Sequence, residues 1–233
     1  MSSWKLSSNR QLTKFTRSSV ESHLPGACRR LLIALLLPAC FFVLSCSTKR
    51  VEIPSFEGVT LEDELARRCA VEALTSTFSI EFEKDGGVVK GDAVLKLTPE
   101  TLELRVYSLG FLVAEVTADE TTATSEPPID KNRIALLVEG LRNSFFWWSI
   151  RNGEIREEEN LYRVRNSWRR VYISKKTFLP ERQVIELEDG RELDVMYGEP
   201  DRISGIWFPS RMRIGLSRYS VNLKIKTLSV TPP

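Results

Sequence analysis

The sequence predicts a mainly β (α+β) fold, an antiparallel sheet of roughly ten to eleven strands accompanied by two helices. Two observations lead to this prediction. Apolar and polar residues alternate with a period of two along most of the chain from Thr77 onward, which is typical of strands with one buried and one solvent-exposed face. Two stretches instead place apolar residues at helical spacing, one before the first strand and one in the middle of the chain.

The first helix is predicted by a start signal and a spacing. Thr60 and Asp63 form a capping-box pattern, with Asp in place of the usual Glu. Leu61, Leu65, Cys69 and Ala73 then recur at four-residue steps, which predicts an amphipathic helix of roughly 15 residues. On this helix we expect Cys69 to be a small buried hydrophobic residue, since the mature chain offers it no disulfide partner.

The strands and the second helix follow from the alternation and from turn signals. The Asp189-Gly190 pair predicts a two-residue hairpin turn of type I′. A helix is expected from Ile129 to Arg142, after a Thr-, Ser-, Glu- and Pro-rich break at 118–128. Strands are expected at Phe78–Lys84, Val88–Leu97, Leu102–Val106, Phe111–Thr117, Leu161–Arg165, Arg169–Ser174, Val184–Leu187, Leu193–Tyr197, Trp207–Ile214 and Tyr219–Val230.

Composition limits the possible functions. The chain has 233 residues, with 33 Lys and Arg against 31 Asp and Glu and a formal net charge of +2, so no broad basic surface is expected for nucleic acid. The single histidine, His23, lies in a segment that we expect to be removed. The mature chain then has no imidazole for a Ser-His-Asp or Cys-His system or for a His-ligated zinc site. We therefore expect no enzyme activity, no catalytic residue, no metal and no cofactor.

The N-terminal segment predicts secretion and lipidation. Residues 1–30 are basic and precede the apolar run Leu31–Ser45, which has the length of a signal core and is shorter than the roughly 20 residues of a membrane-spanning helix. The run ends in Val43-Leu44-Ser45-Cys46, which resembles a bacterial lipobox. We expect 1–45 to be a lipoprotein signal peptide and Cys46 to carry diacylglycerol and a fatty acid. A retained membrane helix, or an ordinary cysteine after a plain signal, is the alternative.

The expected domain organisation follows from this signal. Residues 46–58 are polar and are interpreted as a lipidated tether, and residues 59–231 as a single domain. Ser47 follows the lipidated cysteine where Asp would signal retention, so the sorting rule of enteric bacteria points to the outer membrane. We expect a monomer that is anchored in the outer membrane by its lipid and faces the periplasm.

The order of these elements resembles a known family. A first helix, a meander containing the stretch Leu102–Thr117, a second helix and a C-terminal sheet are similar to the lipoprotein localisation factors LolA and LolB, most of all LolB. Ser108-Leu109-Gly110 occupies the place of the family's Pro-Leu-Gly loop. The resemblance implies that the sheet is a curved antiparallel half-barrel covered by two or three helices. It also implies a membrane-insertion loop at Leu109, Gly110 and Phe111. Two departures stand out: Ser108 replaces the proline, and strand Phe78–Lys84 lacks the arginine with which the soluble carrier holds its lid.

The resemblance also implies a function. The protein would receive acylated lipoproteins, or a related lipid, from a periplasmic LolA-like carrier and insert them into the outer membrane. The alternative is a lipid- or protein-binding envelope lipoprotein of the same fold that transfers nothing and has a structural or sensing role. An apolar cavity would hold the acyl chains, although a sealed core would use the same residues. Its candidate lining residues are Phe78, Ile80, Phe82, Leu95, Leu104, Val106, Leu137 and Leu141.

Three further features leave alternatives open. Leu109 is either an exposed apolar finger or a strand-end residue that folds back onto the core. The aromatic run Phe145–Trp148 is either a cavity rim or interfacial belt, or a strand segment with half of its rings in the core. The cations of the later strands either contact anionic headgroups or belong to a solvated sheet face. These cations are Arg163, Arg165, Arg169, Arg170, Lys175 and Lys176.

Overall fold

The computed structural model describes residues 58–150 and 152–231. The predicted signal peptide, the lipidated Cys46 and all of the tether except its last residue lie outside the described residues. No helix in the described part of the chain has the length and apolar character needed to cross a membrane. The elements are α2 (Leu61–Cys69), β1 (Ala73–Lys84), β2 (Gly87–Leu97), β3 (Leu102–Ser108), β4 (Phe111–Ala118), β5 (Ala123–Glu126), α3 (Lys131–Ala135), the π-helix η1 (Leu136–Gly140), α4 (Leu141–Phe145), β6 (Glu154–Glu157), β7 (Leu161–Arg165), β8 (Arg169–Ser174), β9 (Pro180–Glu186), β10 (Glu192–Tyr197), β11 (Pro200–Ile203), β12 (Ile206–Pro209), β13 (Arg211–Leu216) and β14 (Tyr219–Thr231).

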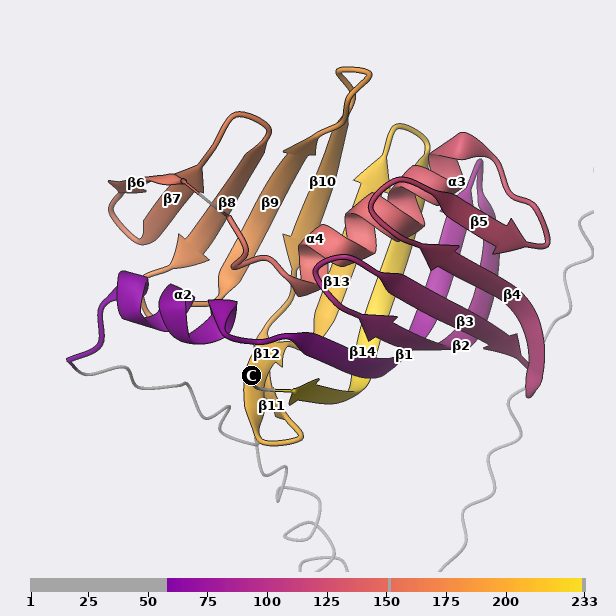
Figure 1. The fold of residues 1–233 in the computed structure, drawn as a ribbon, viewed down its shortest axis with the longest axis horizontal. Helices are drawn as coiled ribbons and strands as arrows, with labels where there is room; N and C mark the ends of the chain where they lie inside the picture. The colour runs from indigo at the N-terminus through magenta and orange to yellow at the C-terminus, as the bar shows by residue number, and fades with distance from the viewer. Residues whose placement is uncertain (1–57, 151, 232–233) are drawn as a thin grey trace, which may run out of the picture. The chain divides into compact units, whose positions relative to one another are not determined.

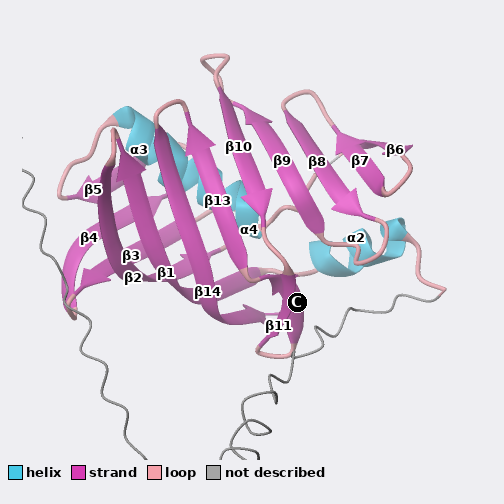
Figure 2. Ribbon diagram, turned by 180° about the vertical axis from the view of Figure 1, so that it is seen from behind, coloured by secondary structure: helices cyan, strands magenta, loops and turns pink. Residues whose placement is uncertain are grey.

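One large antiparallel sheet organises the described residues. It has 12 strands in the order β5-β4-β3-β2-β1-β14-β13-β10-β9-β8-β7-β6, and β11 and β12 form a separate two-stranded sheet. The large sheet is open, with β5 and β6 at its edges. It curves around the helices α3 and α4, which cross one face, while the other face carries no described helix (Figures 1 and 2). The predicted fold class, a mainly β fold built on a curved antiparallel sheet covered by helices, is confirmed.

The hydrophobic core lies between the sheet and the segment α3–η1–α4. Phe78 of β1 packs against Phe145 at the end of α4, with ring centroids 5.8 Å apart, and Phe145 stacks on Phe208 of β12 at 5.7 Å. Gly140 allows η1 to approach β13 closely, because a Cβ at this position would lie only 2.7 Å from a methyl carbon of Ile214. The interior beneath the helices is therefore filled by side chains in close contact.

The first helix is shorter than predicted. The capping box exists, since the Thr60 hydroxyl accepts a hydrogen bond from the Asp63 N–H at 3.2 Å and the Asp63 carboxylate accepts one from the Thr60 N–H at 3.4 Å. The helix ends at Cys69 after nine residues. Ala73 already pairs with Thr231 in the β1–β14 ladder, so the sheet takes the residues that the helical spacing had included. Cys69 is exposed and its thiol donates to the Trp148 carbonyl at 3.6 Å, so the prediction that it is buried was wrong.

Several local predictions were also wrong. Of the Asp189-Gly190 pair only Gly190 has a positive φ, so the turn is not type I′; the Gly190 N–H donates to the Leu187 carbonyl at 2.9 Å in a longer loop. The predicted strand Trp207–Ile214 is divided at Ser210 into β12 and β13. The four rings of Phe145–Trp148 do not alternate along a strand, because they end α4 and form the following turn, and all four are buried. Strands β5, β6 and β11 were not predicted.

Candidate functional site

The turn between β3 and β4 has an unusual residue for its geometry. Ser108 pairs with Phe111, so the hairpin loop consists of Leu109 and Gly110 alone. Both have positive φ, +51° for Leu109 and +84° for Gly110, as the central residues of a type I′ turn require. Glycine adopts this conformation freely, whereas a branched apolar side chain there costs about 1–2 kcal/mol. Leucine therefore occupies this position although the left-handed backbone conformation disfavours it.

The side chains around this turn are apolar and exposed. Leu109 exposes 96% of its surface, Phe111 75%, Leu112 51% and Val113 43%. We call these four side chains the apolar tip. The nine residues from Val106 to Ala114 include no charged side chain. Leu109 thus projects into solvent and does not fold back onto the core.

A β-bulge explains why three consecutive residues of β4 are exposed. Val106 pairs with Ala114 and Tyr107 pairs with Leu112, which leaves Val113 as an extra residue on β4. The extra residue interrupts the alternation of inward and outward side chains. The predicted insertion loop ended at Phe111 and did not include Leu112 and Val113. The unbroken apolar run Phe111-Leu112-Val113, in a chain that otherwise alternates, was the signal that could have identified them.

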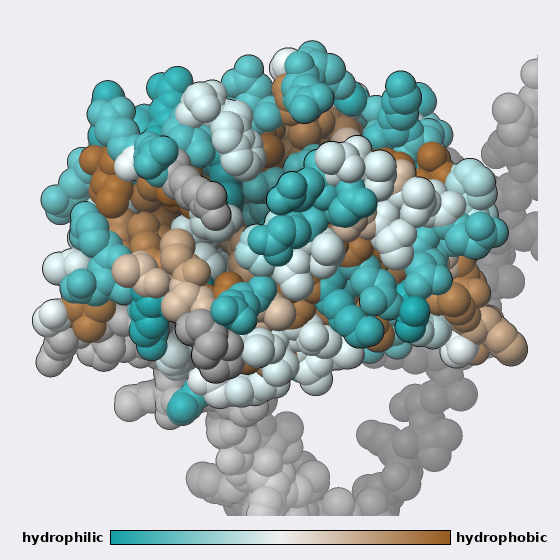
Figure 3. Space-filling view, viewed as in Figure 1, coloured by the Kyte–Doolittle hydropathy of each residue, from teal (hydrophilic) through white to brown (hydrophobic). Residues whose placement is uncertain are grey.

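Neither neighbouring strand pairs with the tip of the hairpin. On one side β5 pairs with β4 only from Glu115 onward, so four residues of β4, about 13 Å of strand, lie beyond that pairing. On the other side β2 pairs with β3 only as far as Tyr107. In Figure 1 the β3–β4 turn lies at the lower right end of the sheet, and brown and tan atoms gather at the same place in Figure 3. The hairpin thus presents its apolar end to solvent without a paired neighbouring strand.

The predicted cavity-lining residues lie in the core instead. Six of the eight are buried, and Phe82 and Val106 are partly buried and pack against the core. The six that lie on strands belong to one hydrophobic cluster with Leu137 and Leu141 of the helix segment α3–η1–α4. None of the pockets described below is lined by any of the eight. These residues therefore form packed interior in this structure and not the wall of an open cavity.

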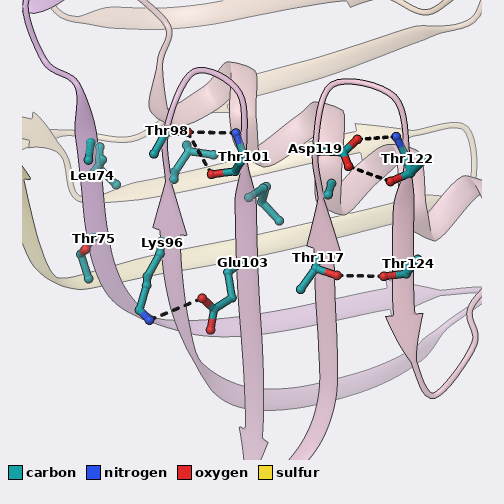
Figure 4. A pocket seen from close by; sticks show the side chains of 14 residues that line it. Leu74, Thr75, Lys96, Thr98, Thr101, Glu103, Thr117, Asp119, Thr122 and Thr124 are labelled. Atoms are coloured by element: carbon teal, nitrogen blue, oxygen red, sulfur yellow. Dashed lines mark hydrogen bonds and ion pairs between the residues drawn. The ribbon is translucent and has the colours of Figure 1, made fainter.

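A pocket of about 550 Å³ lies at the ends of β1 to β5. Threonines dominate its lining, and Figure 4 shows Thr98 with Thr101 and Thr117 with Thr124 joined by hydrogen bonds. Asp119 accepts hydrogen bonds from the backbone N–H groups of Thr121 and Thr122, each at 2.7 Å, and from their hydroxyls. These donors lower the pKa of Asp119 to about 2. Leu74, Leu97 and Leu102 also line this pocket, so its wall combines polar and apolar groups.

Arg169 does not belong to the surface cations with which it was predicted. It is buried, with 2% of its surface exposed, and it lines a second pocket, of about 530 Å³, with polar neighbours. Its guanidinium donates to the carbonyls of Asn143 and Phe146, both at 3.0 Å, and to Oε1 of Gln183 at 3.4 Å. Burial lowers the pKa of Arg169 to about 10. Arg169 thus holds the carbonyl end of α4, where helix backbone acceptors lack partners within the helix.

The other predicted cations are mostly paired at the surface. Arg163 pairs with Glu158 at 3.3 Å, Arg170 with Glu192 at 2.6 Å and Lys175 with Glu157 at 2.7 Å. Neighbouring carboxylates neutralise much of this face, which favours the solvated-face interpretation. Among the described residues no three His, Cys, Asp or Glu side chains are placed to hold a metal ion.

Comparisons with known proteins give likenesses of fold. No protein-family model and no curated protein matches this sequence. Similar solved structures include a LolA superfamily protein from Nitrosomonas europaea, with 10% identity, coverage of 76% of this chain and 96% of the other, and a TM-score of 0.49. A DUF1329 family protein from Desulfovibrio piger has 13% identity, covers 73% and 90%, and has a TM-score of 0.47. A putative outer membrane lipoprotein-sorting protein domain from Vibrio parahaemolyticus has 10% identity, covers 73% and 92%, and has a TM-score of 0.41. Similarity at this level carries no argument about ligand or function, and the specific resemblance to LolB stays a prediction.

Proposed function

We propose that this chain is an envelope lipoprotein, anchored in the outer membrane through Cys46, that receives acylated lipoproteins or a related lipid and inserts them into that membrane. The observation that carries the proposal is the apolar tip, with Leu109 96% exposed. Moving a leucine or phenylalanine side chain from water into lipid is worth about 1.5–3 kcal/mol. The tip is therefore suited to entering the headgroup region of a bilayer while the charged sheet stays outside.

The backbone at Leu109 adds a second reason. A left-handed leucine costs folding energy, and an exposed apolar side chain returns none of it through burial. Folding alone would favour asparagine, aspartate or glycine at this turn. Both the backbone conformation and the exposure of the side chain make leucine unfavourable for folding here. Such a residue is expected where function requires it, and contact with lipid is such a function.

The cargo needs cover during transfer. Each methylene in water costs about 0.8 kcal/mol, so an acyl chain of about 15 methylenes costs on the order of 12 kcal/mol. The space between the sheet and α3–η1–α4 is lined by apolar residues but is filled in this structure. Acyl chains would enter only if the helix segment moves away from the sheet. Arg142 fastens this segment to the strand ends through the Glu100 carbonyl at 3.3 Å and the Asp119 carbonyl at 3.2 Å.

The test is delivery of an acylated lipoprotein from a periplasmic carrier to liposomes. Leu109→Glu should leave the fold nearly intact, because the side chain contacts solvent, and should abolish delivery. Val89→Glu is the matched control, since Val89 is 67% exposed on β2 outside the tip. It should deliver at the wild-type rate. Unimpaired delivery by Leu109→Glu would remove the tip from the mechanism.

The closed interior favours a second candidate function. A lipoprotein that binds a lipid or a protein partner without transferring it needs no acyl cavity. Mass spectrometry of lipids retained by residues 47–233, purified without detergent, separates the two. Retained acyl lipid together with delivery supports transfer, whereas no retained lipid and no delivery by the wild type leaves the non-transferring function.

A further inference from the structure

The pocket beside Arg169 has the dimensions and chemistry of a small-ligand site. Its volume of about 530 Å³ lies within the range of ligand pockets in proteins. The β7–β8 turn and the segment after α4 form it. We call it the amide pocket, after the side chains of Asn152 and Asn166 in its lining. It lies on the half of the sheet that carries β6 to β9, away in sequence from the apolar tip.

Trp168 provides an aromatic surface in this pocket. Its side chain is 40% exposed, whereas Trp147 and Trp148 are buried and Trp207 is half-buried. The main chain of Trp168 is fixed on both sides. Its N–H donates to the Asn166 side-chain oxygen at 3.2 Å, and its carbonyl accepts from the Glu186 N–H at 2.7 Å. The guanidinium carbon of Arg169 lies 5.8 Å from the centroid of the Trp168 ring, and the ring still leaves apolar area exposed at the surface.

Polar groups beside the ring remain available. The Asn152 carboxamide and the Ser167 hydroxyl make no side-chain hydrogen bond within residues 58–150 and 152–231, and both side chains are exposed. The Asn166 amide nitrogen is likewise not engaged, since this side chain uses its oxygen. Amides offer donors and acceptors together, which suits ligands rich in hydroxyl groups. An aromatic plane flanked by such groups fits a sugar ring.

The charge in the pocket has one sign. Arg169 forms part of the lining, it is buried, and its hydrogen bonds go to carbonyl and amide oxygens and not to a carboxylate. Its Nε is buried without a partner. No carboxylate side chain lines the pocket. A cation that no protein anion neutralises creates a strong positive potential in a poorly solvated region. An anionic ligand gains from this potential, and a neutral one does not.

We propose that the amide pocket binds an acidic sugar, whose ring stacks on Trp168, whose hydroxyls bind Asn152, Asn166 and Ser167, and whose carboxylate lies in the field of Arg169. Nothing in this proposal depends on lipid transfer by the apolar tip. Its failure would leave the proposed function unchanged, and the reverse is also true.

The test follows the indole N–H resonances of the protein by NMR, with Trp168→Phe identifying the Trp168 resonance by its loss. Glucuronate should shift this resonance in a saturable way. Glucose, which lacks the charge, should bind several-fold more weakly, and acetate, which lacks the ring, should not shift it. Trp168→Ala, which lacks this resonance, should weaken glucuronate binding about five- to tenfold in isothermal titration calorimetry, because an aromatic contact is lost. Arg169 is left unchanged because it also holds the end of α4.

Two further variants complete the design. Asn152→Ala should weaken binding as well, because it removes one of the amides that bind the sugar hydroxyls. Asn152 is exposed, so its loss leaves the core untouched. Met196→Ala, at a 47% exposed apolar side chain on β10, should bind glucuronate as the wild type does. No saturable shift of the Trp168 resonance, or unchanged binding by folded Trp168→Ala, would overturn the proposal. Equal affinity for glucose and glucuronate would overturn the role of Arg169.

Discussion

Two hairpins of the same sheet use the same turn geometry with different residues. The β1–β2 turn is Asp85-Gly86, with φ of +49° and +83°, and the β3–β4 turn is Leu109-Gly110, with φ of +51° and +84°. Asp85 is a residue that this geometry favours, and it also pairs with Arg218 at 3.4 Å. Leu109 is disfavoured by the geometry and makes no such contact. The first turn serves the fold, and we interpret the second as serving a ligand at some cost to the fold.

The largest expected effect separates the two hairpins by lipid binding. Leu109→Ser combined with Phe111→Ser should weaken the binding of residues 47–233 to vesicles about 100-fold or more, since two apolar contacts are lost. Cosedimentation with neutral phosphatidylcholine vesicles measures this. Val88→Ser with Val89→Ser is the control, because these exposed valines lie next to the β1–β2 turn. Equal losses in both double variants would mean that the tip is not special.

Replacing Leu109 should weaken lipid binding but increase the stability of the fold. Leu109→Asn should raise the free energy of unfolding by about 1 kcal/mol, because asparagine tolerates the left-handed conformation. The midpoint of thermal unfolding should rise by about 2–4 °C. Asp85→Leu, which gives the first turn the residue of the second, should lower stability by a similar amount. Urea unfolding measures both, and a destabilised Leu109→Asn would show that Leu109 supports the fold.

The contribution of a third turn, between β4 and β5, to the stability of the fold should depend on pH. The pKa of Asp119 between β4 and β5 is about 2, below its ordinary value of 3.8. The folded state therefore favours the ionised carboxylate, and its contribution is complete above about pH 4 and is lost as the pH falls toward 2. Stability measured across this range should fall less steeply in Asp119→Asn than in the wild type. Parallel curves would show that the Thr121 and Thr122 hydrogen bonds do not distinguish the folded state.

The smallest expected effect concerns salt. The segment Val106–Ala114 is uncharged, so binding of the wild-type tip to phosphatidylcholine vesicles should hardly change between low and high ionic strength. Anionic phosphatidylglycerol should likewise add little. A strong loss of binding in salt would instead point to the cations of β6 to β9 as the contact with lipid.

The alternating strands were the part of the fold that sequence patterns predicted well. Local polarity marks one wet and one buried face, and the strands β7, β8 and β14 lie close to their expected bounds. The short edge strands β5 and β6 were missed because each has only four residues, which is too few for an alternation to be detected. The length of α2 was overestimated because Ala73 fits the four-residue spacing of the helix as well as the start of β1.

The candidate site was predicted only in part. Leu109 was identified because the family resemblance placed it in the insertion loop, and because an apolar residue at a hairpin turn contradicts turn chemistry. Leu112 and Val113 were missed, since a β-bulge is set by the pairing partner and not by the strand itself. Arg169 was grouped with Arg170 as a surface cation, but neighbouring residues of a strand point to opposite faces, and only the sheet shows which face lies beneath α4.

Because Gly140 lies so close to Ile214, adding a single methyl group at position 140 should change the distance between η1 and β13. A Cβ placed 2.7 Å from that isoleucine would act as a wedge and push η1 outward from β13. Gly140→Ala would then keep the space between η1 and the sheet partly open without adding charge or removing any aromatic ring from beneath the helices. If fatty chains belong in that space, the wedged protein should take them up from solution more readily than its parent.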